Sequence, residues 1–335
     1  MNKLKRALKN TWARNRGCLF GYAVMLLVVT LYVIANPNIL SSYGIKSTTD
    51  QFLNLTFAAL AQTLVILTGG IDLSIGSQIG LTNAICATIM GSVARALGHD
   101  GLGIAVTILI TLCAGLILGL FNGAIIVYGR LQPIVVTLAS SFIFVGLGLF
   151  ICPTPGGDVL PAFSKMIIGR FFGVIPRSLV WILAAVFLLW LPLRRSRFGQ
   201  SIYAIGGGEY ASFVSGINIK RTKLWVYGLA GVFCAMSGVL LTASTMAGDP
   251  TGCEGFTLNA VAATVLGGTS LAGGKGSFVG TVAGVIVFTL ILALLIFWGV
   301  NSYYQSAASG IMLVVALSID FVQRFISEKK RIQVA

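Results

Sequence analysis

Gly-Gly-Ile-Asp-Leu-Ser at positions 69–74 and Gly-Gly-Thr-Ser-Leu-Ala-Gly-Gly at positions 267–274 each interrupt a long apolar stretch of this chain. Each stretch is long enough to lie within a bilayer, and the two lie in opposite halves of the sequence. Paired apolar segments interrupted by glycine, in corresponding halves, are typical of a membrane pathway built from an internal repeat.

The composition around these breaks is that of a polytopic membrane protein. Of 335 residues, 56% are hydrophobic and 10% are charged, whereas soluble domains carry about 25% charged residues. Because a helix crosses the hydrocarbon core with roughly 20 apolar residues, and barrel strands alternate in segments of about ten, the charge-free stretches predict helices. We expect an all-α polytopic fold of about ten transmembrane helices in two related halves, at 18–35, 51–68, 74–95, 102–128, 133–151, 176–193, 223–246, 257–272, 277–298 and 303–322.

The net charge of +14 is distributed along the chain as membrane topology predicts, so we expect no nucleic-acid partner. If the N-terminus is cytoplasmic, all but five of the 23 basic residues lie on the cytoplasmic side, as the positive-inside rule requires. Both termini are then cytoplasmic. The expected order is a basic N-terminus at 1–17, six spans in 18–193, a cytoplasmic loop at 194–222, four spans in 223–323 and a tail at 324–335.

The two halves are expected to be related because 69–80 resembles 267–280. Each is followed by a glycine-rich apolar helix and then by a Ser/Ala-rich helix start, at 137–141 and at 306–310. Membrane helices are often rich in small residues, so coincidence remains the alternative.

Two charged residues near the breaks have structural interpretations. Asp72 is an acid in an apolar neighbourhood, which favours function, but Leu73-Ser74 begins a helix that Asp72 would cap. We favour the cap over a proton relay because no intramembrane basic or histidine partner is present. Lys275 lies among glycines but is followed by Gly276, so the P-loop pattern is not met.

The six cysteines are scattered without a CxxC pair, and His99 is the single histidine. We therefore expect no metal site, no cofactor and no catalytic set. Cys152 and Cys253 both fall near the outer face, and whether they pair stays open.

Polar and glycine residues inside the spans are candidates for lining a translocation path. Buried amides in lipid also hold helices together, so each candidate has a structural alternative. The candidates are Gln62, Gly69, Gly70, Asn83, Asn122, Gly267 and Gly268.

The inner loop contains a short tract, 209–215, that forms about two helical turns. Gly206–Gly208 are expected to break the chain before it, and Gly216 suits its end. Its apolar residues, Ala211, Phe213 and Val214, fit either a partner protein or a lipid surface.

The chain resembles the membrane permease subunits of bacterial ATP-binding cassette importers for sugars, the ribose, galactose, xylose and autoinducer group. The resemblance rests on 67–77, 131–138, 197–217 and 258–276, and it extends across nearly the whole chain.

The resemblance implies a permease in the bacterial inner membrane that imports a monosaccharide or related small sugar. It implies three kinds of partner besides the lipid bilayer, namely cytoplasmic ATP-binding subunits, a periplasmic sugar-binding protein, and a second permease subunit in a homo- or heterodimer. ATP hydrolysis is then expected on a separate chain. The Cys253-Glu254 region and the length of 152–175 depart from the family pattern where the binding protein would dock.

The resemblance also makes 206–217 the segment that couples to the ATPase. The residues expected there are Gly208, Glu209, Ala211, Ser212, Val214 and Gly216, with Glu209 and Ser212 as polar contacts. The alternative function is an ion-driven secondary carrier for a small polar solute. It leaves the inner-loop helix unexplained and relies on Asp72 alone.

Overall fold

The computed structural model describes residues 16–171, 173 and 175–332, and most of this part is helical. One short hairpin pairs β1 (Arg170–Phe171) with β2 (Ile175–Pro176). The helices are α2 (Arg16–Ala35), η1 (Pro37–Leu40), α3 (Ser42–Leu67), α4 (Ile75–Leu97), α5 (Asp100–Gly129), α6 (Pro133–Ile151), α7 (Pro161–Ile168), α8 (Arg177–Ala184), η2 (Ala185–Trp190), α9 (Leu191–Arg195), α10 (Arg197–Gly207), α11 (Glu209–Val214), α12 (Ile219–Thr245), α13 (Gly255–Leu266), α14 (Phe278–Phe297) and α15 (Ser302–Ile332).

The predicted all-α membrane fold is confirmed. Within the described residues, seven helical segments are long and apolar enough to cross a membrane, and Gly21–Ala35 and Gly255–Leu266 are shorter apolar helices. The sixth predicted span is made of α8, η2 and α9 in succession. The span expected at 257–272 is the 12-residue α13, which ends at Leu266 because the chain turns at the following glycines. The predicted number of ten is therefore approximate.

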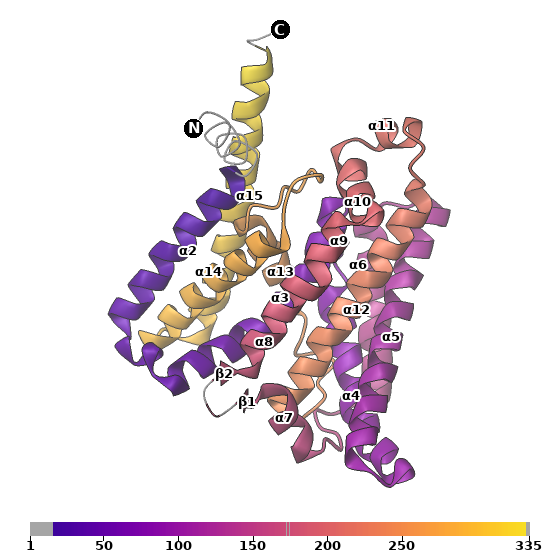
Figure 1. Ribbon diagram of the computed structural model, residues 1–335, viewed down its shortest axis with the longest axis vertical. Coiled ribbons are helices and arrows are strands. Elements are labelled where there is room, and N and C mark those ends of the chain that lie inside the picture. Colours follow the sequence, from indigo (N-terminus) through magenta and orange to yellow (C-terminus); the bar gives the residue numbers. More distant parts are fainter. Residues whose placement is uncertain (1–15, 172, 174, 333–335) are drawn as a thin grey trace.

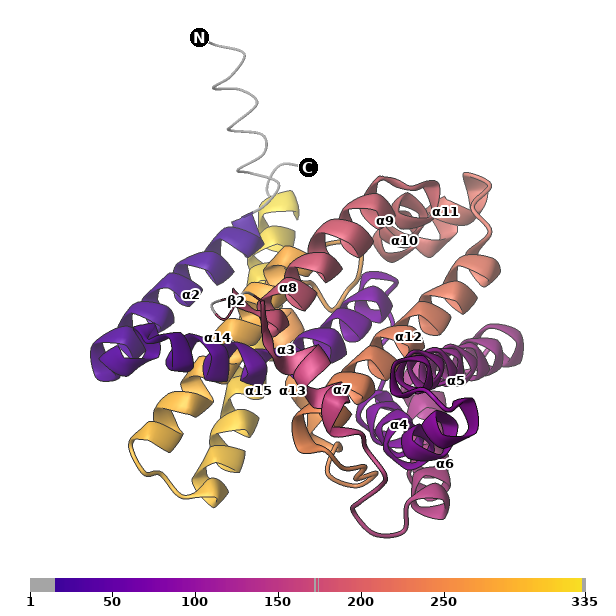
Figure 2. The same ribbon diagram turned by 60° about the horizontal axis from the view of Figure 1, so that its bottom comes forward.

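Helix α3 lies between two groups of helices (Figures 1 and 2). In one group, α12 packs against α4 and α5, and α6 lies against α4. In the other, α14 packs against α2 and α13, and α15 contacts both α13 and α14. Because α3 contacts both α12 and α14, helices from opposite halves of the sequence interleave in space.

The core is centred on α3, which is buried on all sides from Leu55 to Leu67. Threonine hydroxyls connect it to the second half of the chain. The Oγ1 atoms of Thr63 and Thr281 lie 2.7 Å apart, and Thr264 Oγ1 donates to the Ala59 carbonyl at 3.1 Å. Hydroxyl contacts of this kind hold helices together where lipid supplies no competing water.

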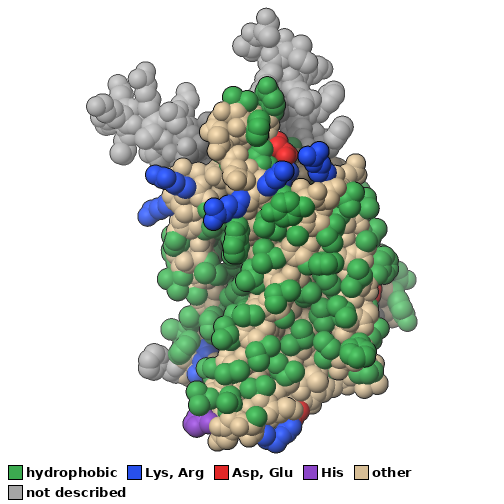
Figure 3. All heavy atoms as spheres, turned by 90° about the vertical axis from the view of Figure 1, so that its right-hand side faces the viewer, with side chains coloured by type: hydrophobic (Ala, Val, Ile, Leu, Met, Phe, Trp, Pro, Cys, Tyr) green, Lys and Arg blue, Asp and Glu red, His purple; other side chains and the backbone are tan. Residues whose placement is uncertain are grey.

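The outer surface of α5 and α6 is apolar. Figure 3 shows a broad band of hydrophobic side chains, with basic side chains gathered toward the two ends. Large side chains are exposed along this band, among them Leu109, Ile117, Phe121, Phe142 and Phe150. An apolar surface this extensive is expected where lipid or another protein covers it.

The basic inner loop and the ends of the described chain share one end of the bundle. Helix α2 begins and α15 ends at the end where α10 and α11 lie, whereas α7 and the hairpin lie at the other end (Figure 1). The predicted terminal segments 1–17 and 324–335 fall partly outside the described residues.

Candidate functional site

The two glycine breaks end their helices with the same backbone geometry. The φ angle of Gly69 after α3 is 81°, and that of Gly268 after α13 is 83°. In each break the glycine N–H bonds the carbonyl three residues back and the next N–H bonds the carbonyl five residues back, at 2.8 and 3.1 Å after α3 and at 2.8 and 3.2 Å after α13. Glycine favours this left-handed helix ending. By this geometry Gly69 corresponds to Gly268. The sequence comparison of 69–80 with 267–280 pairs Gly69 with Gly267 instead, so the structural correspondence is shifted by one residue.

The other glycines of the breaks allow close approach of neighbouring elements. A Cβ on Gly70 would lie 2.8 Å from the Tyr227 hydroxyl of α12. A Cβ on Gly267 would lie 2.8 Å from the Thr281 Cα and overlap the Gly280 carbonyl. These predicted path residues therefore set how closely the breaks pack on α12 and α14.

Asp72 lies in a buried polar cluster at the start of α4. Its Oδ1 accepts hydrogen bonds from the Ser74 N–H at 2.8 Å and the Ser74 hydroxyl at 2.5 Å. The Ser74 hydroxyl in turn accepts from Gln78 Nε2 and from Asn122 Nδ2, both at 2.8 Å. Asp72 thus bonds the residue that precedes α4, and through it the cluster connects the break to α5.

The three predicted path amides differ in their bonding. Asn83 donates to Thr242 Oγ1 at 2.8 Å and to the Ala247 carbonyl at 3.0 Å, and its oxygen accepts from the Asp249 N–H at 2.7 Å. Among the described residues, the amide nitrogen and oxygen of Gln62 both lack a hydrogen-bond partner. The amide oxygen of Asn122 also lacks one. Asn83 is engaged in holding the outer loop, whereas Gln62 keeps buried polar atoms available.

The loop predicted at 194–222 contains two helices, α10 and α11, which are joined at Gly208. Helix α10 continues through Gly206 and Gly207, so the break expected over Gly206–Gly208 is confined to Gly208. Glu209 Oε2 pairs with Lys223 Nζ at 2.8 Å. Ser212 is buried and donates to the Gly208 carbonyl at 2.9 Å, so its hydroxyl is occupied within the chain.

Helix α11 exposes apolar side chains at the basic end of the bundle. Tyr210 is 83% exposed, and Phe213 and Val214 are each 69% exposed. Ala211 is also exposed, and Gly216, with φ of 80°, ends the segment. Tyr210 was not named from the sequence, although an exposed aromatic residue in a six-residue loop helix is itself a signal for an interface.

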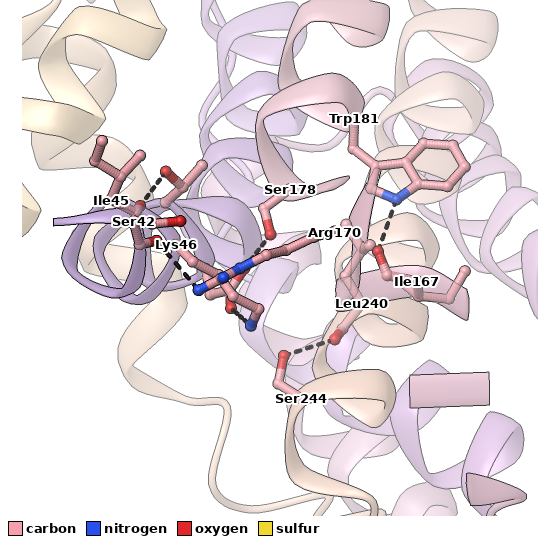
Figure 4. Close-up of polar contacts among 11 residues, drawn as sticks. Ser42, Ile45, Lys46, Ile167, Arg170, Ser178, Trp181, Leu240 and Ser244 are labelled. Carbon is pink, nitrogen blue, oxygen red and sulfur yellow. Dashed lines mark hydrogen bonds and ion pairs between the residues drawn. The ribbon is translucent and has the colours of Figure 1, made fainter. Parts of the chain in front are cut away.

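At the opposite end of the bundle, the long loop at 152–175 is fixed to its neighbours. Arg170 Nη2 donates to the Ser42 carbonyl at 3.2 Å, and Trp181 Nε1 donates to the Ile167 carbonyl at 3.1 Å (Figure 4). The Gly156 and Gly248 backbones exchange two hydrogen bonds, at 3.0 and 2.7 Å. The loops around 156 and 248 are therefore joined to each other.

The outer cysteines are not paired. Cys152 and Cys253 are both free thiols, and burial raises the pKa of Cys253 to about 12. The side chain of Cys18 lies outside the described part of the structure. In the described ranges, no three His, Cys, Asp or Glu side chains are grouped closely enough to hold a metal ion.

Comparison with known proteins identifies relatives along most of the chain. A family described as "Branched-chain amino acid transport system / permease component" matches residues 44–317. The ribose import permease protein RbsC of Escherichia coli K12 is 34% identical over 324 residues, covering 94% of this chain and 96% of that protein. RbsC of Bacillus subtilis is 36% identical over 307 residues, covering 91% and 92%.

A galactose/methyl galactoside import permease, MglC of Haemophilus influenzae, is 33% identical over 312 residues, covering 89% of this chain and 92% of that protein. No solved structure matches the chain. The resemblance expected from the sequence motifs is confirmed, and the chain belongs to this family of membrane transport permease components.

Proposed function

We propose that this chain is the permease subunit of an ATP-binding cassette importer that carries a monosaccharide or related small sugar into the cytoplasm. The observation that carries the proposal is similarity over nearly the full length to proteins named as ribose and galactose import permeases. The chain provides the path across the membrane, and a separate ATP-binding chain hydrolyses ATP.

The end that carries α10 and α11 faces the cytoplasm in this proposal, together with both termini. The concentration of basic residues in 194–223 supports that orientation. The ATP-binding subunits dock on α11, where Tyr210, Phe213 and Val214 are exposed at a polar end of the bundle. The 206–217 segment is the coupling segment.

The opposite end receives a periplasmic sugar-binding protein. The joined loops around 156 and 248 offer it a firm surface. Charged groups lie on that surface, including the ion pair between Arg95 and Asp158, whose atoms lie 2.5 Å apart, and the exposed Glu254.

A second permease, identical or related, covers part of the apolar flank, and lipid covers the remainder. The exposed apolar side chains along α5 and α6 support this arrangement. Transport follows a two-state change in which ATP binding on the partner favours one opening of the bundle over the other.

The proposal is tested by uptake into proteoliposomes that contain this chain with its ATP-binding and sugar-binding partners. Uptake of labelled ribose or galactose is measured with ATP inside, with and without ionophores that dissipate proton and sodium gradients. We expect uptake to require ATP and to survive ionophores. Uptake that needs an ion gradient and proceeds without ATP would establish the secondary-carrier alternative instead.

Docking on α11 is tested separately by Tyr210→Ser. A central aromatic contact contributes about 2 kcal/mol to an interface, so attachment of the ATP-binding chain should weaken by roughly 30-fold. Tyr43→Ser is the matched control, because Tyr43 is 76% exposed but lies at the start of α3, at the other end of the bundle. Equal co-purification of the ATP-binding chain with both variants would exclude α11 as the docking site.

A further inference from the structure

Three backbones meet without intervening side chains at the inner end of the bundle. The Gly274 N–H donates to the Leu67 carbonyl at 3.0 Å, which bonds the second glycine break to the end of α3. A Cβ on Gly273 would lie 2.9 Å from the Gly69 nitrogen and 3.0 Å from the Gly206 Cα of α10. We name the residues Gly69, Gly206, Gly273 and Gly274 the glycine junction.

Gly206 is the member of the junction contributed by the inner loop. A Cβ at this position would overlap both the Leu67 carbonyl oxygen and the Gly274 nitrogen. A backbone contact of this kind has no rotamers with which to absorb a displacement. A shift of α10 therefore has to move the two breaks or separate from them.

A second contact fastens α10 to the far end of the second break. The Tyr203 hydroxyl donates to the Gly276 carbonyl at 2.7 Å. The Tyr203 ring lies 6.2 Å from the ring of Trp190, which stacks on Phe278 at 4.1 Å with the planes 8° apart. Phe278 is the first residue of α14, so α10 is tied to the helix that follows the break as well as to the break itself.

The exposed docking helix is directly continuous with this contact. The Gly208 N–H bonds the carbonyls of Ala204 and Ile205, which closes α10, and α11 begins at Glu209. Only two residues separate Gly206 from Glu209, the first residue of α11. A force applied to α11 therefore reaches Gly206 through only two residues, the non-helical Gly208 and Gly207 at the end of α10.

We propose that the glycine junction transfers movement of the α10–α11 loop to both membrane breaks at once, with Gly206 as the positioning residue that keeps the three backbones in contact. This inference rests on the proposed function, because it assumes a partner that moves the loop. It assigns to Gly206 a role in coupling that is separate from docking, and it explains why α10 has glycine at a helical position where alanine is favoured.

Gly206→Ala tests the junction, and Gly207→Ala is its matched control. Both substitutions favour helix α10, but no described atom lies within 4 Å of a Cβ on Gly207. The complete complex is assayed for retained ATP-binding chain, for ATP hydrolysis, and for sugar taken up per ATP hydrolysed. We expect Gly206→Ala to retain the ATP-binding chain but to lower uptake per ATP by about ten-fold, with Gly207→Ala close to wild type.

Two outcomes with Gly206→Ala would overturn the inference. The first is an uptake per ATP that stays within about two-fold of the Gly207→Ala control. The second is a loss of the ATP-binding chain in proportion to the loss of uptake, which would make Gly206 a docking residue. If Gly206→Ala does not fold, Tyr203→Phe removes the hydroxyl contact to the Gly276 carbonyl and keeps the aromatic ring. Lower uptake per ATP with full attachment supports the junction, and unchanged uptake per ATP overturns it.

The wild-type complex distinguishes failure of this inference from failure of the proposed function. If the wild type shows ATP-dependent uptake and the junction variants are unaffected, the inference is refuted and the proposed function still holds. Absence of ATP-dependent uptake by wild type sinks the proposed function, and the inference with it.

Discussion

At the scale of single residues, the Asp72 carboxylate makes local hydrogen bonds although it is surrounded by membrane helices. Its contacts are to Ser74, two residues on, and to Gln78, six residues on. Within the described residues, no salt bridge involves Asp72. Asp72 therefore makes structural contacts, but the predicted cap was placed wrongly: the N-cap residue of α4 is Ser74, and Asp72 bonds Ser74 and the Gln78 side chain instead of a backbone N–H of the first turn.

Substitutions at Asp72 separate a structural role from proton transfer. Asp72→Ala leaves the buried Ser74 N–H without its acceptor, which should cost about 1–3 kcal/mol of stability. Asp72→Asn keeps an oxygen acceptor and should lose less. Thermal unfolding in detergent and ATP-driven uptake are measured for both. Abolished uptake in a stably folded Asp72→Asn protein would instead identify Asp72 as a proton carrier.

Asp249 gives the outer loop a pH dependence. The Gly252 N–H donates to Asp249 Oδ1 at 3.0 Å, and this backbone hydrogen bond lowers the pKa of the Asp249 carboxyl below its usual value. A lowered folded-state pKa means that the turn is stabilised above the unfolded pKa and loses that stabilisation as the pH falls through the folded one.

The expected result is protection of the Gly252 amide from hydrogen exchange at neutral pH and weaker protection at a pH below the Asp249 pKa, after correction for intrinsic exchange. Asp249→Ala should show the weak protection at both pH values. Strong protection of the amide in Asp249→Ala would mean that the turn does not depend on the carboxylate.

At the scale of elements, glycine contacts decide which helices pack together. A Cβ on Gly231 of α12 would overlap the Gly115 carbonyl of α5 and lie 2.9 Å from the Gly119 nitrogen. The α5–α12 contact therefore depends on small residues on both helices, as is common in membrane bundles.

Gly231→Ala should destabilise the protein by about 1–3 kcal/mol, because the added methyl group forces the two backbones apart. Gly146→Ala in α6 is the control, since no described atom lies within 4 Å of a Cβ there, and its effect should stay within about 1 kcal/mol. Thermal unfolding in detergent measures both. Equal melting temperatures would show that α5 and α12 separate freely.

Several elements were predictable from sequence and others were not. The spans at 102–128 and 133–151 agree closely with α5 and α6, because long apolar runs ended by turn residues define them locally. The end of α13 was misplaced, since an apolar run continues past Gly268 although the backbone has already turned there. Helix α10 was missed because its glycines are poor helix formers, and its packing against both breaks outweighs that preference.

At the scale of the whole molecule, one end carries α11, the proposed docking helix, and the other carries the joined loops around 156 and 248 (Figure 1). If the first end is cytoplasmic, positions at opposite ends must label from opposite sides of the membrane. Lys220 is the second residue of α12 and His99 immediately precedes α5; both are exposed, and they lie at opposite ends of the bundle.

In a variant without native cysteines, His99→Cys should react with a membrane-impermeant maleimide in intact spheroplasts, and Lys220→Cys only in inverted vesicles. Each position is the control for the other. Reaction of Lys220→Cys from the outside would reverse the proposed orientation and move the docking face to the wrong compartment for ATP.

The sequence by itself determined the membrane class, the approximate spans, the basic end and the family, because charge distribution, apolar length and local motifs are properties of the chain that need no folding. Only the tertiary structure decided which distant residues come into contact. Gly69, Gly206 and Gly274 lie far apart in sequence, and contacts at backbone distance between them arise only when α3, α10 and the second break are packed. The same packing lets the Asn83 oxygen accept the Asp249 N–H, whereas the Gln62 amide is buried without a hydrogen-bond partner among the described residues. The two side chains carry the same amide group, so the sequence alone could not distinguish them.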